Sequence, residues 1–182
     1  TIPFFPVFMI KDNLREYPEF TLPSGYDFCM YQEGFQSDWA RIQAAVDHFG
    51  SINEALEHFE KEFLVHPDKL VQRCIFVKDA RGSLIGTVSL WEGEHFGETM
   101  PRVHWLAVHP EHQGKGIAKA LMTRLLEVCN SLGYEKPLYL ITQTWSYVAI
   151  NMYLKFGFKP YLGEKPVNWS GTPEDFQKNN AI

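Results

Sequence analysis

The chain has 182 residues, enough for one domain with a sizeable core, and its 45% hydrophobic and 21% charged residues are typical of a globular protein. A formal net charge of -5, without any run of lysines or arginines, argues against nucleic acid as the main partner. The sequence has no stretch apolar enough to cross a bilayer, and Thr1–Pro6 lacks the basic start of a signal peptide, so we expect a cytoplasmic protein without a membrane partner.

The first third of the chain predicts an arm, a strand and two helices. Residues 1–25 are rich in proline and are predicted to form an extended N-terminal arm. Alternation over 26–32 predicts a first strand, and apolar residues at three-and-four spacing predict a helix over 38–49. Ser51 and Glu54 have the spacing of a capping box, which predicts the start of a second helix.

The rest of the chain alternates between strand and helix patterns without a repeat or a low-complexity linker, so we expect a single domain over 1–182. The predicted elements are strands at 73–78 and 84–91 around a hairpin turn, a strand at 102–108, a long helix at 116–131, a strand at 138–143, a helix at 146–155 and a strand at 158–162. Residues 163–182 are predicted to form a C-terminal tail.

The most informative segment is the glycine-bearing turn between the strand at 102–108 and the long helix. Backbone N–H groups at the first turn of a helix have no internal partner, and the helix dipole adds to their attraction for anions. A phosphorylated ligand is therefore expected here. The Walker pattern is excluded because Ile117 stands where a magnesium-binding hydroxyl is required, and the dinucleotide pattern is excluded because Lys119 stands where the third glycine belongs.

The turn carries Gln113-x-x-Gly116-x-Ala118, which resembles the Gln/Arg-x-x-Gly-x-Gly/Ala signature of the GNAT superfamily of acetyl-CoA-dependent N-acyltransferases. A second motif of that superfamily follows about thirty-five residues further along the chain. Asn151 and Tyr153 lie two residues apart in a helix that leads into a glycine-phenylalanine turn. Two motifs in the expected order make a chance match improbable.

The resemblance implies an α/β fold of the α+β type, with a central mixed, mostly antiparallel sheet of six or seven strands and about four flanking helices. It also implies acetyl-CoA as acyl donor, no metal, and direct attack by a primary amine of a small molecule within a ternary complex. Two alternatives stay open: a non-catalytic acyl-CoA-binding sensor or interaction module, and transfer of a longer acyl group or transfer to a hydroxyl. The family also allows a homodimer.

Candidate catalytic residues follow from the needs of this reaction. By resemblance to the family motif, Tyr153 lies beside the sulfur of the donor and is expected to protonate the departing thiolate, although a core tyrosine would have the same spacing. His104 is the candidate base, since histidine titrates near neutral pH, and alternation would put it on one face of its strand with Leu106. Glu92 is the second candidate base. The position where the family often has a glutamate carries Arg102, which departs from the pattern.

The resemblance assigns the acyl donor to backbone and side-chain groups of both motifs. These are Leu106, Ala107, Val108, Gln113, Gly114, Lys115, Gly116, Ile117, Ala118, Asn151 and Tyr153. Aromatic residues with nearby carboxylates would suit a cationic acceptor, although the same aromatics could be core. The acceptor candidates are Phe35, Trp39, Glu92 and Trp145. The segment His109–His112 lacks a third ligand, so no metal site is predicted there.

Overall fold

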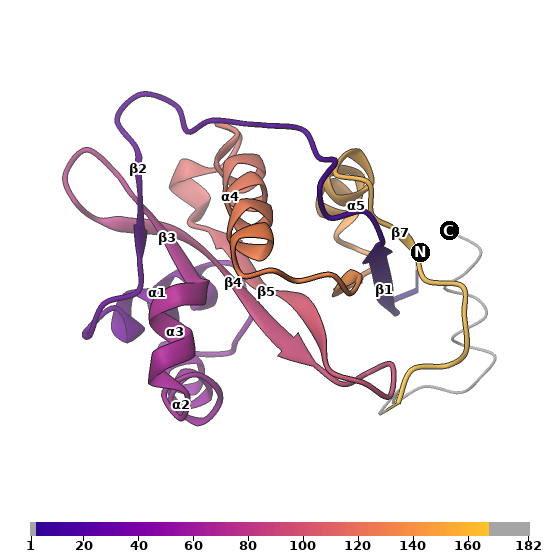
Figure 1. Ribbon diagram of the computed structural model, residues 1–182. Coiled ribbons are helices and arrows are strands. Elements are labelled where there is room, and N and C mark those ends of the chain that lie inside the picture. Colours follow the sequence, from indigo (N-terminus) through magenta and orange to yellow (C-terminus); the bar gives the residue numbers. More distant parts are fainter. Residues whose placement is uncertain (1–2, 168–182) are drawn as a thin grey trace. The chain divides into compact units, whose positions relative to one another are not determined.

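The structure, a computed structural model, describes residues 3–167 (Figure 1). Within this range it has seven strands and five α-helices. In chain order the elements are β1 Pro6–Lys11, β2 Asp27–Met30, α1 Gln36–Ala45, α2 Ile52–Glu62, α3 Pro67–Arg73, β3 Cys74–Lys78, β4 Leu84–Gly93, β5 Met100–Val108, α4 Ile117–Ser131, β6 Leu138–Gln143, α5 Tyr147–Lys155 and β7 Lys159–Pro160, with a short 3-10 helix at Pro110–His112.

The chain divides into two compact units. Among the described residues, unit 1 consists of 3–18, Trp91–Val103 and 129–167, and unit 2 of Glu19–Leu90 and His104–Val128. Strands β4 and β5 run from one unit into the other, and the strand order of the sheet is β2-β3-β4-β5-β6-β1-β7. The predicted fold class is thereby confirmed, and the single domain stays a prediction.

Unit 2 contains an antiparallel β2-β3-β4 meander, helices α1 to α3 and most of α4, whose last three residues belong to unit 1. Strand β2 pairs with β3 from Asp27↔Lys78 onward, and β3 pairs with β4 across the predicted hairpin turn. Helix α2 begins as predicted, because the Ser51 side chain accepts a hydrogen bond from the Glu54 N–H. Its apolar face buries Phe59 completely, in contact with the equally buried Trp39 of α1.

Unit 1 is organised around β1, β6 and β7. Strand β1 is antiparallel to both β6 and β7, and β5 joins β6 in parallel at Arg102↔Tyr139. Its core includes Phe8, Met100 and Tyr139, with Phe96 packed against them. These pairings make the sheet mixed, with antiparallel pairs in the majority.

Two elements were not predicted. Strand β1 lies inside the segment expected to be an extended arm. Its flanking prolines suggested a break, but Pro6 is the first residue of the strand, where the missing N–H does no harm. Helix α3 has seven residues, too few for a clear period, and starts with Pro67 at a position that tolerates proline. Most of the predicted tail, residues 168–182, lies outside the described residues.

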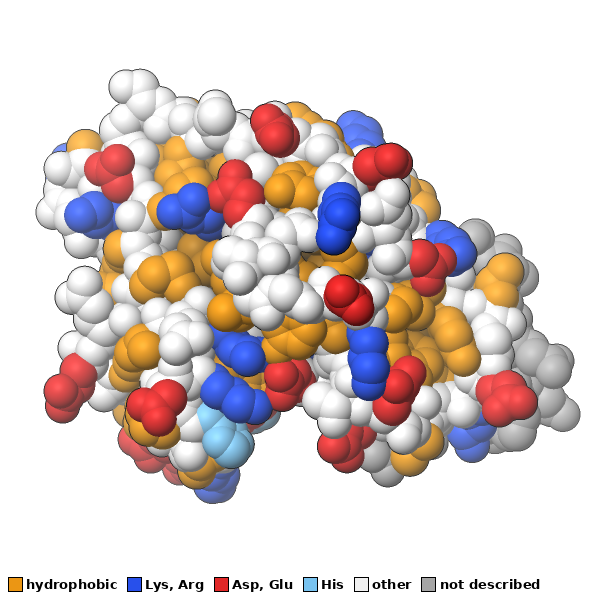
Figure 2. Space-filling model, in the orientation of Figure 1, with side chains coloured by type: hydrophobic (Ala, Val, Ile, Leu, Met, Phe, Trp, Pro, Cys, Tyr) orange, Lys and Arg blue, Asp and Glu red, His pale blue; other side chains and the backbone are white. Residues whose placement is uncertain are grey.

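The charged side chains are mixed in sign. Figure 2 shows acidic and basic side chains interspersed over the visible face, with hydrophobic side chains between them. Among the described helices, none has the length and apolar character needed to cross a membrane.

Candidate functional site

The glycine-bearing turn has the backbone geometry that its sequence suggests. After the 3-10 helix Pro110–His112, Gly114 and Gly116 have φ values of +76° and +82°, in the left-handed region that favours glycine. Helix α4 begins at the next residue, and the Gly116 carbonyl accepts a hydrogen bond from the Ala120 N–H at 3.1 Å. The turn therefore leads directly into the positive end of a 15-residue helix.

The space beside these glycines is open. A Cβ atom added at Gly114 or Gly116 would find no heavy atom within 4 Å. Because neither glycine has a side chain, a ligand can approach the backbone at these two positions more closely than if another residue stood there. The cradle fits an anionic group such as a diphosphate, because the first-turn N–H groups of α4 point out of the helix end.

Side chains tie this turn to the rest of unit 2. The Tyr26 hydroxyl lies 2.8 Å from Nδ1 of His112 and accepts a hydrogen bond from the Lys115 ammonium at 3.2 Å. Gln113 donates its side-chain N–H to the Val108 carbonyl at 2.9 Å, which joins the turn to the end of β5. The Gln113 side chain therefore braces the turn, and Tyr26 holds it from the start of the β2 segment.

A cavity of about 1390 Å³ opens beside the turn. Residues of three segments, within 23–41, 78–85 and 109–115, line it. Lys115 belongs to this lining, and so does Phe35, one of the predicted acceptor residues. Unit 2 thus brings Phe35 and the predicted donor-binding turn to one cavity.

The backbone of β5 is irregular next to the candidate base. Trp105 has φ of +53°, which is rare for a bulky residue and costs about 1–3 kcal/mol. The Gln43 side chain holds this conformation by donating to the Trp105 carbonyl at 2.8 Å. The prediction that His104 and Leu106 share one face assumed a regular strand, and the left-handed backbone at Trp105 interrupts that regularity.

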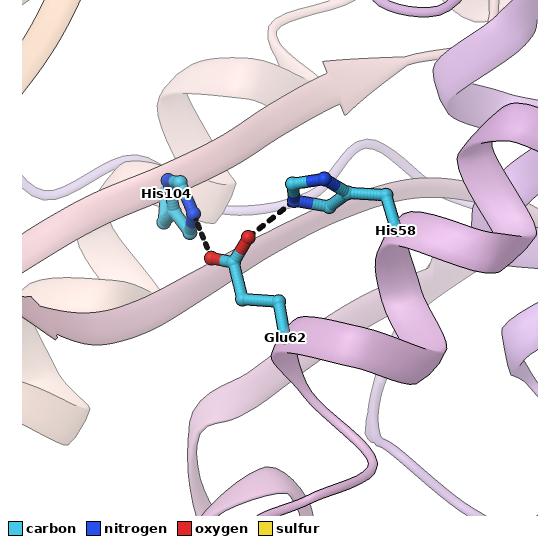
Figure 3. A group of neighbouring side chains, drawn as sticks. All are labelled: His58, Glu62 and His104. Carbon is cyan, nitrogen blue, oxygen red and sulfur yellow. Dashed lines mark hydrogen bonds and ion pairs between the residues drawn. The ribbon is translucent and has the colours of Figure 1, made fainter.

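His104 lies in a cluster with two residues of helix α2 (Figure 3). Nε2 of His104 is hydrogen-bonded to Oε1 of Glu62, and Nε2 of His58 forms an ion pair with Oε2 of the same carboxylate. His58 and Glu62 are four residues apart and so project from one face of α2. We name these three side chains the His-Glu-His cluster.

The surroundings of the cluster favour a charged carboxylate. Burial by itself raises the pKa of Glu62, but the hydrogen bonds and charges of His104 and His58 outweigh it, and the pKa is lowered from its ordinary value. The side chain of His104 is only 8% exposed, against 25% for Glu62 and 35% for His58. The cluster thus runs from the buried His104 to the half-exposed His58.

Aromatic rings enclose the cluster. The Trp39 ring lies parallel to the His58 ring, with 6.5 Å between the ring centroids. The Trp105 ring lies edge-on to His58, with 5.1 Å between the centroids. Phe63 lies 6.0 Å from the His104 ring. Trp39, predicted to bind the acceptor, is fully buried in these contacts.

The other predicted site residues belong to unit 1. Tyr153 is buried on α5 beside Phe158, and this burial raises the pKa of its phenol above the ordinary value. Asn151 is exposed on the same helix. Glu92 accepts a hydrogen bond from the Tyr134 hydroxyl at 2.6 Å, and Trp145 is 59% exposed, with its ring against Phe4.

Three residues that shape these sites were missed from the sequence. Tyr26 gave no signal, since its partners lie 86 or more positions away. The four-residue spacing of His58 and Glu62 does predict a shared helix face. Nothing in the sequence places His104 opposite that face, because the partners are 42 positions apart.

Residues 38–158 match the Acetyltransferase (GNAT) family. Spermidine N(1)-acetyltransferase of Vibrio cholerae is 29% identical over 105 residues, which cover 58% of this chain and 60% of that protein. N-acetyltransferase 8B of Mus musculus is 31% identical over 88 residues, which cover 47% of this chain and 38% of that protein. The chain thus spans less than two thirds of the length of these curated relatives.

Solved structures show the same fold. An acetyltransferase of the GNAT family from Colwellia psychrerythraea superposes with a TM-score of 0.65 at 12% identity, covering 87% of this chain and 54% of that one. A GCN5-related N-acetyltransferase from Sphaerobacter thermophilus gives a TM-score of 0.54 at 16% identity, covering 96% and 47%. The family match extends over more than half of the sequence, so this chain belongs to the GNAT acetyltransferase family, as its two motifs predicted.

Proposed function

We propose that this protein transfers an acetyl group from acetyl-CoA to a primary amine of a small molecule. The observation that carries the proposal is the open, left-handed Gly114–Gly116 turn at the start of α4. The family supports the same donor, and the Vibrio cholerae relative is named for an amine acceptor, spermidine. A cytoplasmic location and a homodimer stay predictions.

The turn is assigned to the diphosphate of the donor. N–H groups at the start of α4 and the ammonium of Lys115 supply hydrogen bonds and positive charge, and the two glycines permit close approach. Leu106, Ala107 and Val108 are assigned to the arm that carries the acetyl group, through their backbone. When bound, acetyl-CoA supplies the activated acetyl group.

The cluster is assigned to proton removal from the amine. An alkyl amine is almost wholly protonated at neutral pH, so it needs a base before it can attack. His104 accepts the proton, and the Glu62 carboxylate orients the ring and stabilises the imidazolium that forms. This carboxylate favours an enzyme over the alternative of a non-catalytic acyl-CoA-binding module, because a binder needs no oriented base.

Tyr153 is assigned to protonation of the departing thiolate, on the strength of the family motif. A phenol is protonated at neutral pH, as a donor must be, and burial raises its pKa further, which makes it a weaker acid toward the thiolate. Of the predicted acceptor residues, Phe35 lines the cavity of unit 2 and is assigned to acceptor binding, whereas Trp39 is buried beside the cluster. Glu92 and Trp145, in unit 1, stay predictions, with Glu92 also a second candidate base.

The first test is thermal unfolding with acetyl-CoA, with adenosine diphosphate as control. Donor at about a hundred times its Kd stabilises the folded state by about 2.7 kcal/mol, which raises Tm by a few degrees. We expect a larger rise with acetyl-CoA than with the control. The absence of a rise at millimolar acetyl-CoA would contradict the proposal.

The second test is thiol release with a panel of amines that includes spermidine and simple monoamines. Release that depends on an amine supports transfer. Binding of acetyl-CoA without release by any amine would favour the non-catalytic module instead. Comparison of acetyl-CoA with longer acyl donors tests the chain-length preference in the same assay.

A further inference from the structure

The His-Glu-His cluster has the composition of a metal site. Two imidazole nitrogens and one carboxylate, from His58, Glu62 and His104, have ligand atoms that all lie within 4.8 Å of one another. We propose that these three side chains bind one divalent transition metal ion of the zinc class. This goes beyond the proposed function and does not rest on it, and it differs from the absence of a metal expected from the sequence.

The donor set selects the class of ion. Two histidines and a glutamate are a known three-ligand set for Zn²⁺, which leaves a fourth position for water. Mg²⁺ and Ca²⁺ prefer oxygen ligands alone, so they are disfavoured. Nickel and copper also accept imidazole and are expected to compete with zinc.

The scaffold holds the ligands where an ion could bind. His58 and Glu62 stand one helical turn apart on α2, and His104 projects from β5, so the ligands come from two elements of unit 2 (Figure 3). The rings of Trp39 and Trp105 pack on His58 and fix its orientation. Such outer contacts reduce the reorganisation that metal binding requires.

The cluster is accessible on one side. The His58 side chain is 35% exposed and that of Glu62 is 25% exposed, which gives an ion a path from solvent. His104 closes the inner side, since it is 8% exposed. Both imidazole nitrogens already face the Glu62 carboxylate, so an ion bound here would take the place of the proton in a hydrogen bond.

Binding would have a consequence for the proposed chemistry. A metal ion on Nε2 of His104 replaces the hydrogen bond to Glu62 and leaves the ring proton on Nδ1, so the imidazole can no longer accept the proton of the amine. The metal-loaded protein would then be less active than the metal-free one. The binding test below uses no acetyl transfer, so its result is separate from the success or failure of the proposed function.

The experiment is a titration of untagged, chelator-treated full chain with Co²⁺ and Zn²⁺. We expect one equivalent of Co²⁺ to give the strong visible absorption of a four-coordinate site, and one equivalent of Zn²⁺ to displace it. Metal analysis after desalting gives the stoichiometry. A stoichiometry well below one, or an absorption typical of six-coordinate cobalt, would overturn the proposal.

Variants of the half-exposed ligands test the location, because they disturb the core less than a change at His104. His58→Gln and Glu62→Gln should each weaken Zn²⁺ binding by at least about tenfold. The matched controls are His66→Gln, an exposed histidine just before α3, and Glu57→Gln, an exposed carboxylate on α2. Circular dichroism confirms folding. Equal binding by ligand variants and controls would place the metal elsewhere and overturn the proposal.

Discussion

The glycine-bearing turn at 109–118 and the His-Glu-His cluster both lie in unit 2, but they are built in opposite ways. The turn uses consecutive residues and presents backbone groups, so only its glycines are irreplaceable. The cluster joins two neighbouring side chains of α2 to His104, which lies 42 positions after Glu62, and it depends on the identity of each one. A local backbone site can therefore be recognised from sequence, whereas a side-chain site assembled by folding cannot.

The two regions should also differ in what they contribute. Backbone N–H groups at a helix start bind an anion whatever the reaction. An imidazole oriented by a carboxylate matters for proton transfer and little for donor binding. We expect changes in the cluster to lower turnover and changes in the turn to lower donor affinity.

The largest effect is expected from His104→Gln. Loss of a general base lowers kcat by about 10²–10⁴-fold, while the Kd for acetyl-CoA should stay within about twofold of that of the unchanged chain. Steady-state thiol release at saturating acetyl-CoA gives kcat, and calorimetry gives Kd.

His66→Gln is the control for this variant, since His66 is exposed and lies outside the cluster. It should keep kcat. An unchanged kcat in His104→Gln would assign the base elsewhere, with Glu92 as the next candidate. Unchanged acetyl-CoA affinity verifies that the variant is folded.

Glu62→Gln is expected to reduce the free energy of unfolding at neutral pH by about 1.5–3 kcal/mol, because an amide cannot accept a hydrogen bond from both imidazoles. The pKa of Glu62 is lowered in the folded state, chiefly by His104 against the effect of burial. Its contribution is therefore fully present above the pKa of the unfolded chain, and is lost as the pH falls through the lowered pKa. The variant and the unchanged chain should converge in acid.

Urea unfolding at about pH 7 and about pH 3 checks this prediction, since glutamate ordinarily titrates between these values. Glu57→Gln is the matched control on the same helix. Glu57 is 69% exposed and its nearest ion-pair distance, to Lys61, is 3.9 Å, so its loss should cost less than about 0.5 kcal/mol at either pH. A constant difference between Glu62→Gln and the unchanged chain at both pH values would contradict the assigned cause.

The sequence predicted the regular parts of the fold because their signals are local. Helix α2 shows its capping box, α4 its apolar period, and β6 matches the predicted 138–143 range. Strand β1 and helix α3 were not predicted, because each is short and carries a proline that suggests a break. These two elements are stabilised by tertiary pairing and packing with distant residues, which a short stretch of sequence does not reveal.

The same reasoning applies to the candidate site. The turn was predicted because its motif, Gln113-x-x-Gly116-x-Ala118, is contiguous in the sequence between a strand pattern and a helix pattern. The partner of His104 was not, because Glu62 reaches it only after α2 packs in unit 2. The left-handed Trp105 was also unpredictable, since a bulky residue gives no hint of such a conformation.

Gly116→Ala tests whether the turn acts through close approach or only through its backbone conformation. Gly116 and Gly133 lie at opposite ends of α4, with φ of +82° and +74°, and at both positions a Cβ would have open space. Alanine at either position should cost about 1–2 kcal/mol of unfolding free energy through backbone strain. Only Gly116→Ala should also raise the Kd for acetyl-CoA, by about tenfold. Equal acetyl-CoA affinity in the two variants would mean that the turn does not bind the donor.

Tyr26→Phe should have the smallest effect on acetyl-CoA affinity. It tests how much side chains contribute to the glycine-bearing turn, which binds through its backbone. Its hydroxyl contacts His112 and Lys115, and loss of such hydrogen bonds costs about 0.5–1.5 kcal/mol, so the Kd for acetyl-CoA should rise about two- to tenfold. Tyr31→Phe is the matched control in unit 2, because the Tyr31 hydroxyl donates to Gln36 at 2.9 Å, away from the turn. Both variants should lose similar stability, but only Tyr26→Phe should lose affinity. If calorimetry shows equal Kd values, the turn does not need the Tyr26 hydroxyl. Donor binding would then depend on the backbone of the turn, whereas the cluster depends on its side chains.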